Sequence, residues 1–158
     1  MRRSKLDKID RRILRDLQED GRMTNVELAH RAGISAPPCL RRVRALEDAG
    51  LIRGYHADVN PEALGFGITV FALVGLASQA EADLKAFEQL VSSWPEVREA
   101  HQLSGEIDFL LKIVAADWDS YQRFLADKLT PAPTVKNVRS MPLNHTAKFA
   151  PGVPIEAE

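Results

Sequence analysis

The sequence predicts an α+β protein of two small domains, the first built from short helices and the second from alternating strands and helices. Three observations lead to this prediction. The 158 residues, 45% hydrophobic and 27% charged, suffice for one ordinary folded domain or two small ones. Apolar residues recur at helical spacing early in the chain, whereas strand-like apolar runs alternate with helical patterns later. The charge divides in a similar place: residues 1–60 contain 13 Lys and Arg against 9 Asp and Glu, and residues 61–158 contain 8 against 13.

The basic first half is compatible with nucleic-acid binding, although the net charge of −1 taken alone argues against it. Cys39 is the only cysteine, which excludes an internal disulfide and a four-cysteine zinc site and favours a reducing cytoplasm. The N-terminal residues lack an apolar signal core, and no run approaches the ~20 apolar residues that span a bilayer. We therefore expect a cytoplasmic protein with no membrane partner, metal or cofactor.

Three short helices are predicted in the first half. The first ends near Gly21, the second runs from the capping pattern at Thr24 to Gly33, and the third runs from Ser35 to Gly50. Two short helices separated by a tight turn that contains glycine, the second of them basic, describe a helix-turn-helix. The residues expected on the apolar face are Leu6, Ile9, Ile13, Leu14 and Leu17 in the first helix, Val26, Leu28, Ala29 and Ala32 in the second, and Ala36, Cys39, Leu40, Val43 and Leu46 in the third.

The third helix carries Arg41, Arg42 and Arg44 away from its apolar face. In a helix-turn-helix the N-terminal turns of the second helix enter the major groove, where Arg pairs with guanine. We expect Arg41 to read a base, and Arg42 and Arg44 to hold the backbone of double-stranded DNA. The alternative is a basic helix face that is only solvated.

Ser35 precedes two prolines at the start of this helix. A capping side chain accepts from the N–H groups two and three positions later, and Pro37 and Pro38 have none. The Ser35 hydroxyl is therefore free for a phosphate oxygen. Asn25, at the start of the second helix, completes the candidate DNA-binding set.

Residues 51–59 alternate apolar and polar side chains and are predicted to form a strand. A strand after the basic helix makes residues 1–59 a winged helix-turn-helix. Residues 60–66 are the predicted hinge to the second domain.

The second domain, residues 67–148, has the β-α-β-β-α-β order of a ferredoxin-like fold. Its first and third strands are apolar on both faces, whereas this fold covers only one face with helices. We therefore infer a homodimer in which two sheets pack together. Residues 149–158, broken by Gly and Pro, should form an extended or mobile arm. Strands are expected at 67–77, 97–104, 107–115 and 135–143, a hairpin turn at 105–106, and helices around Leu84, Phe87, Leu90 and Val91 and around Trp118, Tyr121, Phe124, Leu125 and Leu129.

Six segments match one known family: LDKIDRRIL at 6–14, NVELA at 25–29, PCLRRV at 38–43, GY at 54–55, SGEIDFLL at 104–111 and YQRFL at 121–125. With them the chain resembles the leucine-responsive regulator and asparagine regulator family, Lrp/AsnC, from about Leu6 to Lys148. The resemblance implies a sequence-specific transcription regulator with a DNA-binding front domain and an amino-acid-sensing back domain. It also implies homodimers that assemble into octamers or larger, on the nucleoid of a bacterium or archaeon.

The resemblance further implies an effector pocket between dimers, around the turn at Gly105. Its turn N–H groups could hold a carboxylate, and the Asp108 carboxylate could accept from an α-ammonium. Alternatively, Asp108 satisfies the hairpin or faces water, Gly105 is only a turn residue, and Trp118 belongs to the core. The residues that the resemblance assigns to this effector pocket are Gln102, Ser104, Gly105, Asp108, Trp118, Met141 and Leu143.

The chain departs from the family pattern at three places. Pro133-Thr134-Val135 stands where Pro-Gly-Val is usual, so the turn must form without glycine. Gln102 stands where an apolar residue is common. Pro142 interrupts the last strand, which suits an edge strand or a strand end.

Two other functions compete. An enzyme is not expected, because the sequence lacks the common hydrolase, metalloprotease, phosphate-loop and dinucleotide patterns, and its four histidines are scattered. An architectural DNA-compacting protein without an effector would keep the basic helix but would not need Gly105 or Asp108.

Overall fold

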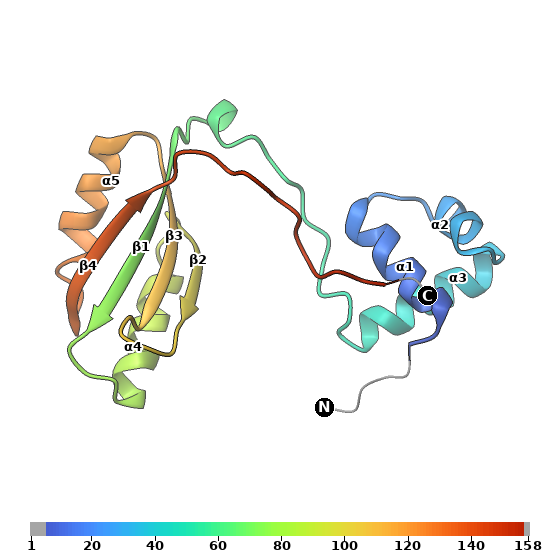
Figure 1. The fold of residues 1–158 in the computed structure, drawn as a ribbon, viewed down its shortest axis with the longest axis horizontal. Coiled ribbons are helices and arrows are strands. Elements are labelled where there is room, and N and C mark those ends of the chain that lie inside the picture. The colour runs from blue at the N-terminus through green and yellow to red at the C-terminus, as the bar shows by residue number, and fades with distance from the viewer. Residues whose placement is uncertain (1–5, 157–158) are drawn as a thin grey trace. The chain divides into compact units, whose positions relative to one another are not determined.

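The computed structural model describes residues 6–156, which form two units (Figure 1). Each unit has its own hydrophobic core. The helical unit contains residues 6–58 together with 148–156, and the sheet unit contains residues 59–147. The C-terminal segment, expected to be an extended or mobile arm, thus groups with the helical unit. No helix within residues 6–156 has the length and apolar character needed to cross a membrane.

The helical unit contains the three predicted helices, and each begins and ends at local sequence signals. Asp7 caps the first helix by accepting from the Asp10 N–H (2.8 Å), and the Asp10 carboxylate accepts from the Asp7 N–H in return. Thr24 caps the second helix, which ends at Gly33 with φ 70°. The helices are α1 (Lys8–Glu19), α2 (Asn25–Ala32) and α3 (Ala36–Asp48).

The core of the helical unit joins one face of each helix. Ile13 from α1, Leu28 from α2, and Cys39 from α3 are each at most 2% exposed. Two predicted core positions are wrong, because Leu40 is 39% exposed and Val26 is 71% exposed. On a helix, neighbouring residues are rotated by about 100°, which turns Leu40 away from the face that contains Cys39.

The strand predicted at residues 51–59 is also wrong for the single chain. Residues 51–52 form bends and residues 53–59 have irregular backbone, and no segment among residues 6–156 pairs with them in a ladder. Alternation alone does not make a strand, because a strand is stabilised by the hydrogen bonds and side-chain pairs of a neighbour.

The sheet unit has the predicted order of strands and helices. Its four strands lie in the order β2-β3-β1-β4, with antiparallel neighbours, so β1 and β3 are central. This is the ferredoxin-like arrangement. The elements are η1 (Glu62–Leu64), β1 (Ile68–Leu76), α4 (Glu81–Ser92), β2 (Val97–Gln102), β3 (Phe109–Ala115), α5 (Trp118–Phe124), the π-helical turn η2 (Leu125–Leu129) and β4 (Val135–Pro142).

Both helices of the sheet unit cover the same face of the sheet. Phe87 from α4 packs against Phe109 with ring centroids 4.8 Å apart, and Tyr121 from α5 is fully buried in the same cluster. Burying a large apolar side chain contributes about 1.5–3 kcal/mol, so this cluster anchors the unit. The strand residues in it are Val70, Ala72, Val74, Leu76, Phe109, Leu111, Ile113 and Ala115.

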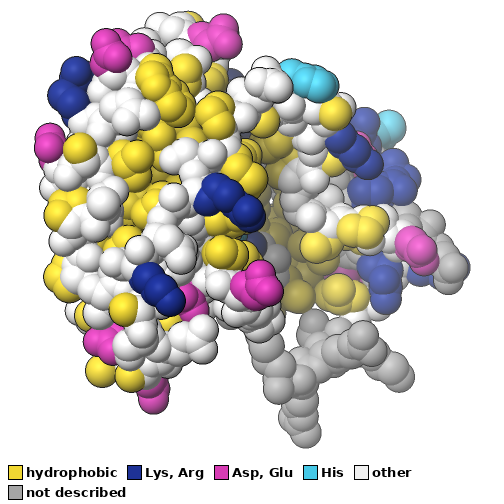
Figure 2. Space-filling model, turned by 60° about the vertical axis from the view of Figure 1, so that its left-hand side comes forward, with side chains coloured by type: hydrophobic (Ala, Val, Ile, Leu, Met, Phe, Trp, Pro, Cys, Tyr) yellow, Lys and Arg dark blue, Asp and Glu magenta, His cyan; other side chains and the backbone are white. Residues whose placement is uncertain are grey.

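The opposite face, which we call the free sheet face, is apolar as predicted. Its apolar side chains alternate along the strands with the buried ones and are half-buried or exposed. At the β2 edge the Lys112 ammonium lies 2.8 Å from the Glu99 carboxylate, which also contacts His101 at 3.3 Å. Hydrophobic side chains gather on the surface of this unit in Figure 2. The apolar members of the free sheet face are Phe71, Leu73, Leu110, Val114 and Met141.

Two of the departures from the family pattern, at Thr134 and at Pro142, lie at the two ends of β4. Thr134 adopts φ 70°, the only positive φ outside glycine among residues 6–156, so it takes the left-handed conformation that glycine usually supplies. Pro142 is the last residue of β4, and β4 is an edge strand. A proline at this position removes no hydrogen bond from the centre of the sheet.

Candidate functional site

The outer surface of α3 presents two arginines that have no ion-pair partner within the described part of the chain. Arg41 and Arg44 are exposed, and neither forms an ion pair with any residue in the range 6–156. Their guanidinium groups therefore keep their donors for an external acceptor. Phosphates and guanine edges are the acceptors that a helix of this kind meets in DNA.

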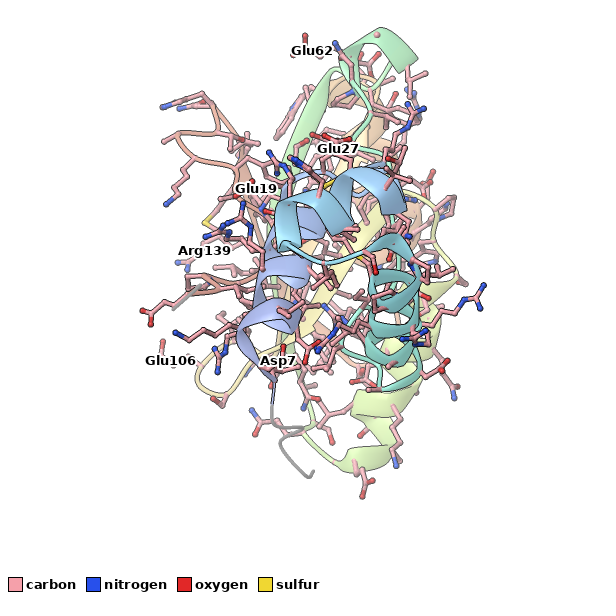
Figure 3. All side chains as sticks on the ribbon, turned by 90° about the vertical axis from the view of Figure 1, so that its right-hand side faces the viewer. Asp7, Glu19, Glu27, Glu62, Glu106 and Arg139 are labelled. Carbon is pink, nitrogen blue, oxygen red and sulfur yellow. The ribbon has the colours of Figure 1, made fainter. Side chains whose placement is uncertain are left out.

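Arg42 differs from its two neighbours because it is bound within the protein. Its Nη1 atom lies 2.7 Å from a carboxylate oxygen of Asp7 and 2.7 Å from one of Asp10, so α3 is joined to the start of α1. Asp7 stands at the beginning of α1 in Figure 3. The Asp10 backbone N–H and the Arg42 guanidinium hold the pKa of Asp7 below its usual value, and the two carboxylates raise the pKa of Arg42. Arg42 thus positions α3 on α1.

The start of α3 has the geometry expected from its prolines. Ser35 has no side-chain capping bond and is exposed, so its hydroxyl is open to solvent. Pro37 is exposed and Pro38 half-buried at the same end. Asn25 donates from Nδ2 to the Ala36 carbonyl (2.8 Å), which joins α2 to α3 across the turn.

A second basic cluster was not singled out from the sequence. Asp16 is 1% exposed, and its carboxylate is surrounded by Arg12 at 3.0 Å, Arg31 at 3.5 Å and Arg15 at 3.9 Å. One buried acid therefore orders three partly exposed arginines from α1 and α2. Arg12 and Asp16 stand four residues apart on one helix, and this spacing was the feature of the sequence that could have predicted their ion pair.

Four of the seven predicted effector residues lie together at the hairpin between β2 and β3. Gln102 ends β2, and Ser104 and Gly105 form the exposed turn, in which Gly105 has φ 140°. Asp108 is 6% exposed, and its carboxylate accepts from the Leu76 N–H (2.6 Å) and from Gln79 Nε2 (2.9 Å). Asp108 therefore holds the end of β1 in addition to any role toward a ligand.

The other three predicted effector residues lie at the opposite end of the sheet. Antiparallel pairing aligns Val74 with Phe109 at the hairpin end and Phe71 with Met141 toward the other end. The Leu143 N–H donates to the Thr69 carbonyl, and Trp118 follows β3 at this same end. A single chain therefore does not bring the seven residues together. Trp118, Met141 and Leu143 are 44%, 41% and 40% exposed.

Comparison with known proteins gives matches to both units. The chain matches the family model for the Lrp/AsnC ligand binding domain at residues 69–153 and the model for winged helix-turn-helix DNA-binding at residues 6–53. It is 58% identical, over 88% of its length and 89% of the relative's, to a leucine-responsive regulatory protein from Rhizobium meliloti (strain 1021). The corresponding protein from Escherichia coli (strain K12) is 42% identical over 85% of this chain and 82% of its own.

Solved structures agree in fold over nearly the whole chain. A transcriptional regulator from Neisseria meningitidis, solved in complex with L-Met, has a TM-score of 0.89 and 38% identity, covering 94% of this chain and 96% of its own. An AsnC family transcriptional regulator from Agrobacterium tumefaciens has a TM-score of 0.87 and 34% identity, covering 94% and 97%. All of these relatives are named as regulators or regulatory proteins.

Proposed function

Because the chain belongs to the Lrp/AsnC family and is a DNA-binding transcription regulator with a ligand-binding domain, we propose that its effector is an α-amino acid. The observation that carries this proposal is the likeness to the Neisseria meningitidis regulator, which was solved with L-Met. Binding of the amino acid to the sheet unit would alter the affinity of the helical unit for DNA or the assembly of the protein. We expect this action in the cytoplasm, on the nucleoid.

For DNA recognition, we propose that Arg41 reads a base and that Arg44 and Ser35 hold phosphates. These side chains are exposed, and among residues 6–156 the two arginines have no ion-pair partner and Ser35 has no capping bond, which supports the assignment. Pro37 and Pro38 would allow the helix start to approach the DNA backbone without unsatisfied N–H groups. Asn25 and Arg42 then act mainly by fixing α3 against α2 and α1.

The DNA proposal is tested by measuring affinity against salt concentration. Arg41→Ala should weaken specific binding by about 1–3 kcal/mol, the value of a bidentate base contact, and should relax the preference at one base pair. Arg44→Ala and Ser35→Ala should weaken binding to all sequences alike, with the Arg44 change lowering the salt slope by roughly one unit. Equal loss on specific and random DNA for Arg41→Ala would contradict its role in base reading.

For the effector, we propose a pocket that two subunits complete. One subunit would supply the hairpin residues Gln102, Ser104, Gly105 and Asp108, and its neighbour would supply Trp118, Met141 and Leu143. The separation of these two groups within one chain supports a shared pocket. The free sheet face supports a homodimer, and the pocket between dimers would extend the assembly to an octamer or larger.

A thermal-shift screen against the twenty amino acids tests the effector proposal. A ligand that binds the native state raises the melting temperature by an amount that grows with its concentration. At least one amino acid should do so and should also change occupancy in a DNA footprint. A regulator that responds to none of them would instead fit the architectural DNA-compacting alternative.

Asp108 needs a variant that separates ligand binding from folding. Asp108→Ala leaves the buried Leu76 N–H without an acceptor, which should cost about 1–3 kcal/mol of stability. Asp108→Asn keeps one acceptor oxygen but loses the negative charge. If Asp108 binds an α-ammonium, the Asn variant should remain folded and lose most of the thermal shift. An unchanged shift in that variant would assign Asp108 to structure alone.

A further inference from the structure

We propose that the C-terminal segment, residues 148–156, is a second tether that carries the effector signal from the sheet unit to α1. The inference rests on the amino-acid effector proposed above. The chain leaves the helical unit after residue 58 and returns to it at residue 148. Two segments of chain, and not one hinge, therefore join the units.

The segment is held on α1 by a specific polar contact. Gln18 donates from Nε2 to the Val153 carbonyl (2.8 Å) and accepts at Oε1 from the Val153 N–H (3.0 Å). The side-chain amide thus binds both polar groups of one backbone residue, as a neighbouring strand would. Gly152, just before it, has φ 92°, and a Cβ at this position would collide with the Gln18 side chain. Only glycine fits here without displacing the contact.

Apart from this contact, the segment is loosely seated. A pocket of about 720 Å³ lies between the segment, α1 and residues 51–56. Val153 and Phe149 are 62% and 65% exposed, and only Ile155 is half-buried. Few buried apolar contacts and exposed hydrogen bonds characterise elements that open at low free-energy cost. The segment is therefore suited to attach and release while both cores stay folded.

Both ends of this tether lie near functional elements. Its upstream end follows β4 closely in the chain, and β4 and the residue after it carry Met141 and Leu143, two of the candidate effector residues. Its downstream end binds α1, which is joined to α3 through the Arg42 ion pairs and through the core around Ile13. A change at the end of β4 can thus reach the candidate DNA-reading helix through continuous chain and packed side chains.

The test measures DNA affinity with and without amino acid in variants that release the segment. Gln18→Ala removes the contact, Gly152→Val blocks it, and a chain ending at Ala147 removes the segment. Gln89→Ala, an exposed glutamine on α4 with no hydrogen bond among the described residues, is the matched control. The probes are L-methionine, L-leucine and any amino acid active in the thermal screen. Affinity for the amino acid itself is measured by calorimetry.

Coupling between an effector and DNA typically changes affinity about 5- to 150-fold. We expect such a change in the natural protein and in Gln89→Ala. In the three segment variants, adding the amino acid should change DNA affinity by no more than about two-fold, although the amino acid still binds. A response retained in Gln18→Ala would overturn the tether while leaving the amino-acid effector intact. Loss of response in the control would also overturn it. If no amino acid changes DNA affinity in the natural protein, both proposals fail.

Hydrogen exchange tests the docking without any effector. The Val153 N–H should be protected in the natural protein and should exchange faster in Gln18→Ala, with Gln89→Ala unchanged. A Val153 N–H that exchanges equally fast in the natural protein and in Gln18→Ala would overturn the proposal, because the Gln18 contact would then not hold the segment on α1. Since neither Gln18 nor Gly152 belongs to the candidate DNA-binding set, DNA affinity without amino acid shows that the helical unit of each variant is folded.

Discussion

At the scale of single residues, Thr134 keeps a backbone conformation that its β-branched side chain disfavours. Left-handed φ and ψ angles cost an ordinary L-residue about 1–2 kcal/mol. The turn before β4 requires this conformation, because it places Val135 in register with Leu76 of β1. The Ala77 N–H also donates to the Thr134 carbonyl at 2.7 Å, which fixes this turn on the end of β1.

Replacing Thr134 with glycine should therefore stabilise the sheet unit. The relief of backbone strain exceeds the entropy that glycine loses on folding, so the free energy of unfolding should rise by up to about 1 kcal/mol. Urea denaturation followed by circular dichroism measures the change. Thr69→Gly, the same substitution at an ordinary position in β1, should instead lower stability. A loss of stability in Thr134→Gly would show that its side-chain contacts outweigh the strain.

The chemical type of several site residues could be predicted from the sequence, but their partners could not. Arg42 was assigned to DNA phosphates from its residue type and its place on the helix, and Asp108 to an ammonium group from the family resemblance. Their carboxylate and amide partners lie 29 to 35 residues away in sequence. Only the fold brings these groups together, so sequence spacing alone gives no sign that the charges are already used.

At the scale of elements, α1 depends on charges at its first turn. Asp7 combines a helix cap with an ion pair to α3, and both favour its ionised form. The ion pair is about half-exposed on the Asp7 side, where solvent weakens it. The cap and the ion pair nevertheless act on the same carboxylate, so both are lost when it is protonated.

The helical unit should consequently lose stability on acidification. The pKa of Asp7 is lower in the folded protein than its reference value of 3.8. Its contribution is complete above that value and is lost as the pH falls through the folded-state pKa, below about 4. Denaturation at pH 5, 4 and 3 should show a smaller decline for Asp7→Asn than for the natural protein. Asp48→Asn, at an exposed carboxylate, serves as the control and should decline like the natural protein.

Elements with local signals were the ones that the sequence could predict. The capped helices and the strands of the sheet unit occur where expected, within a few residues. The strand at 51–59 does not occur, because its alternating pattern has no partner within residues 6–156. A helix contains its own hydrogen bonds, whereas a strand depends on a second segment that the pattern does not name.

At the scale of the whole molecule, the prediction of a homodimer rests on the free sheet face. Leu73 lies on this face beside Leu110 of β3 and Arg139 of β4. A charge introduced at Leu73 would be tolerated in a single subunit, where it meets water and Arg139. In a packed dimer the same charge would be buried, at a cost of several kcal/mol.

Leu73→Glu should therefore shift the protein from dimer to monomer without unfolding it. Light scattering across a dilution series measures the dissociation constant, which should rise by at least about 100-fold, and circular dichroism checks the fold. Gln89→Glu, which adds the same charge to exposed α4, should leave the dimer unchanged. A dimer of undiminished affinity in Leu73→Glu would locate the interface elsewhere.

The antiparallel register of the sheet also constrains the symmetry of larger assemblies. The free sheet face can meet a copy of itself, which gives an isologous contact that closes after two subunits. The two groups of candidate effector residues lie at opposite ends of the sheet. If a contact between two subunits brings these ends together once, and not twice in a reciprocal way, that contact is heterologous, head to tail. Head-to-tail contacts repeat from dimer to dimer until a ring closes, or else continue as a filament. Each such contact would then contain one ligand pocket. The fraction of pockets that hold a ligand would rise with protein concentration, because more rings close.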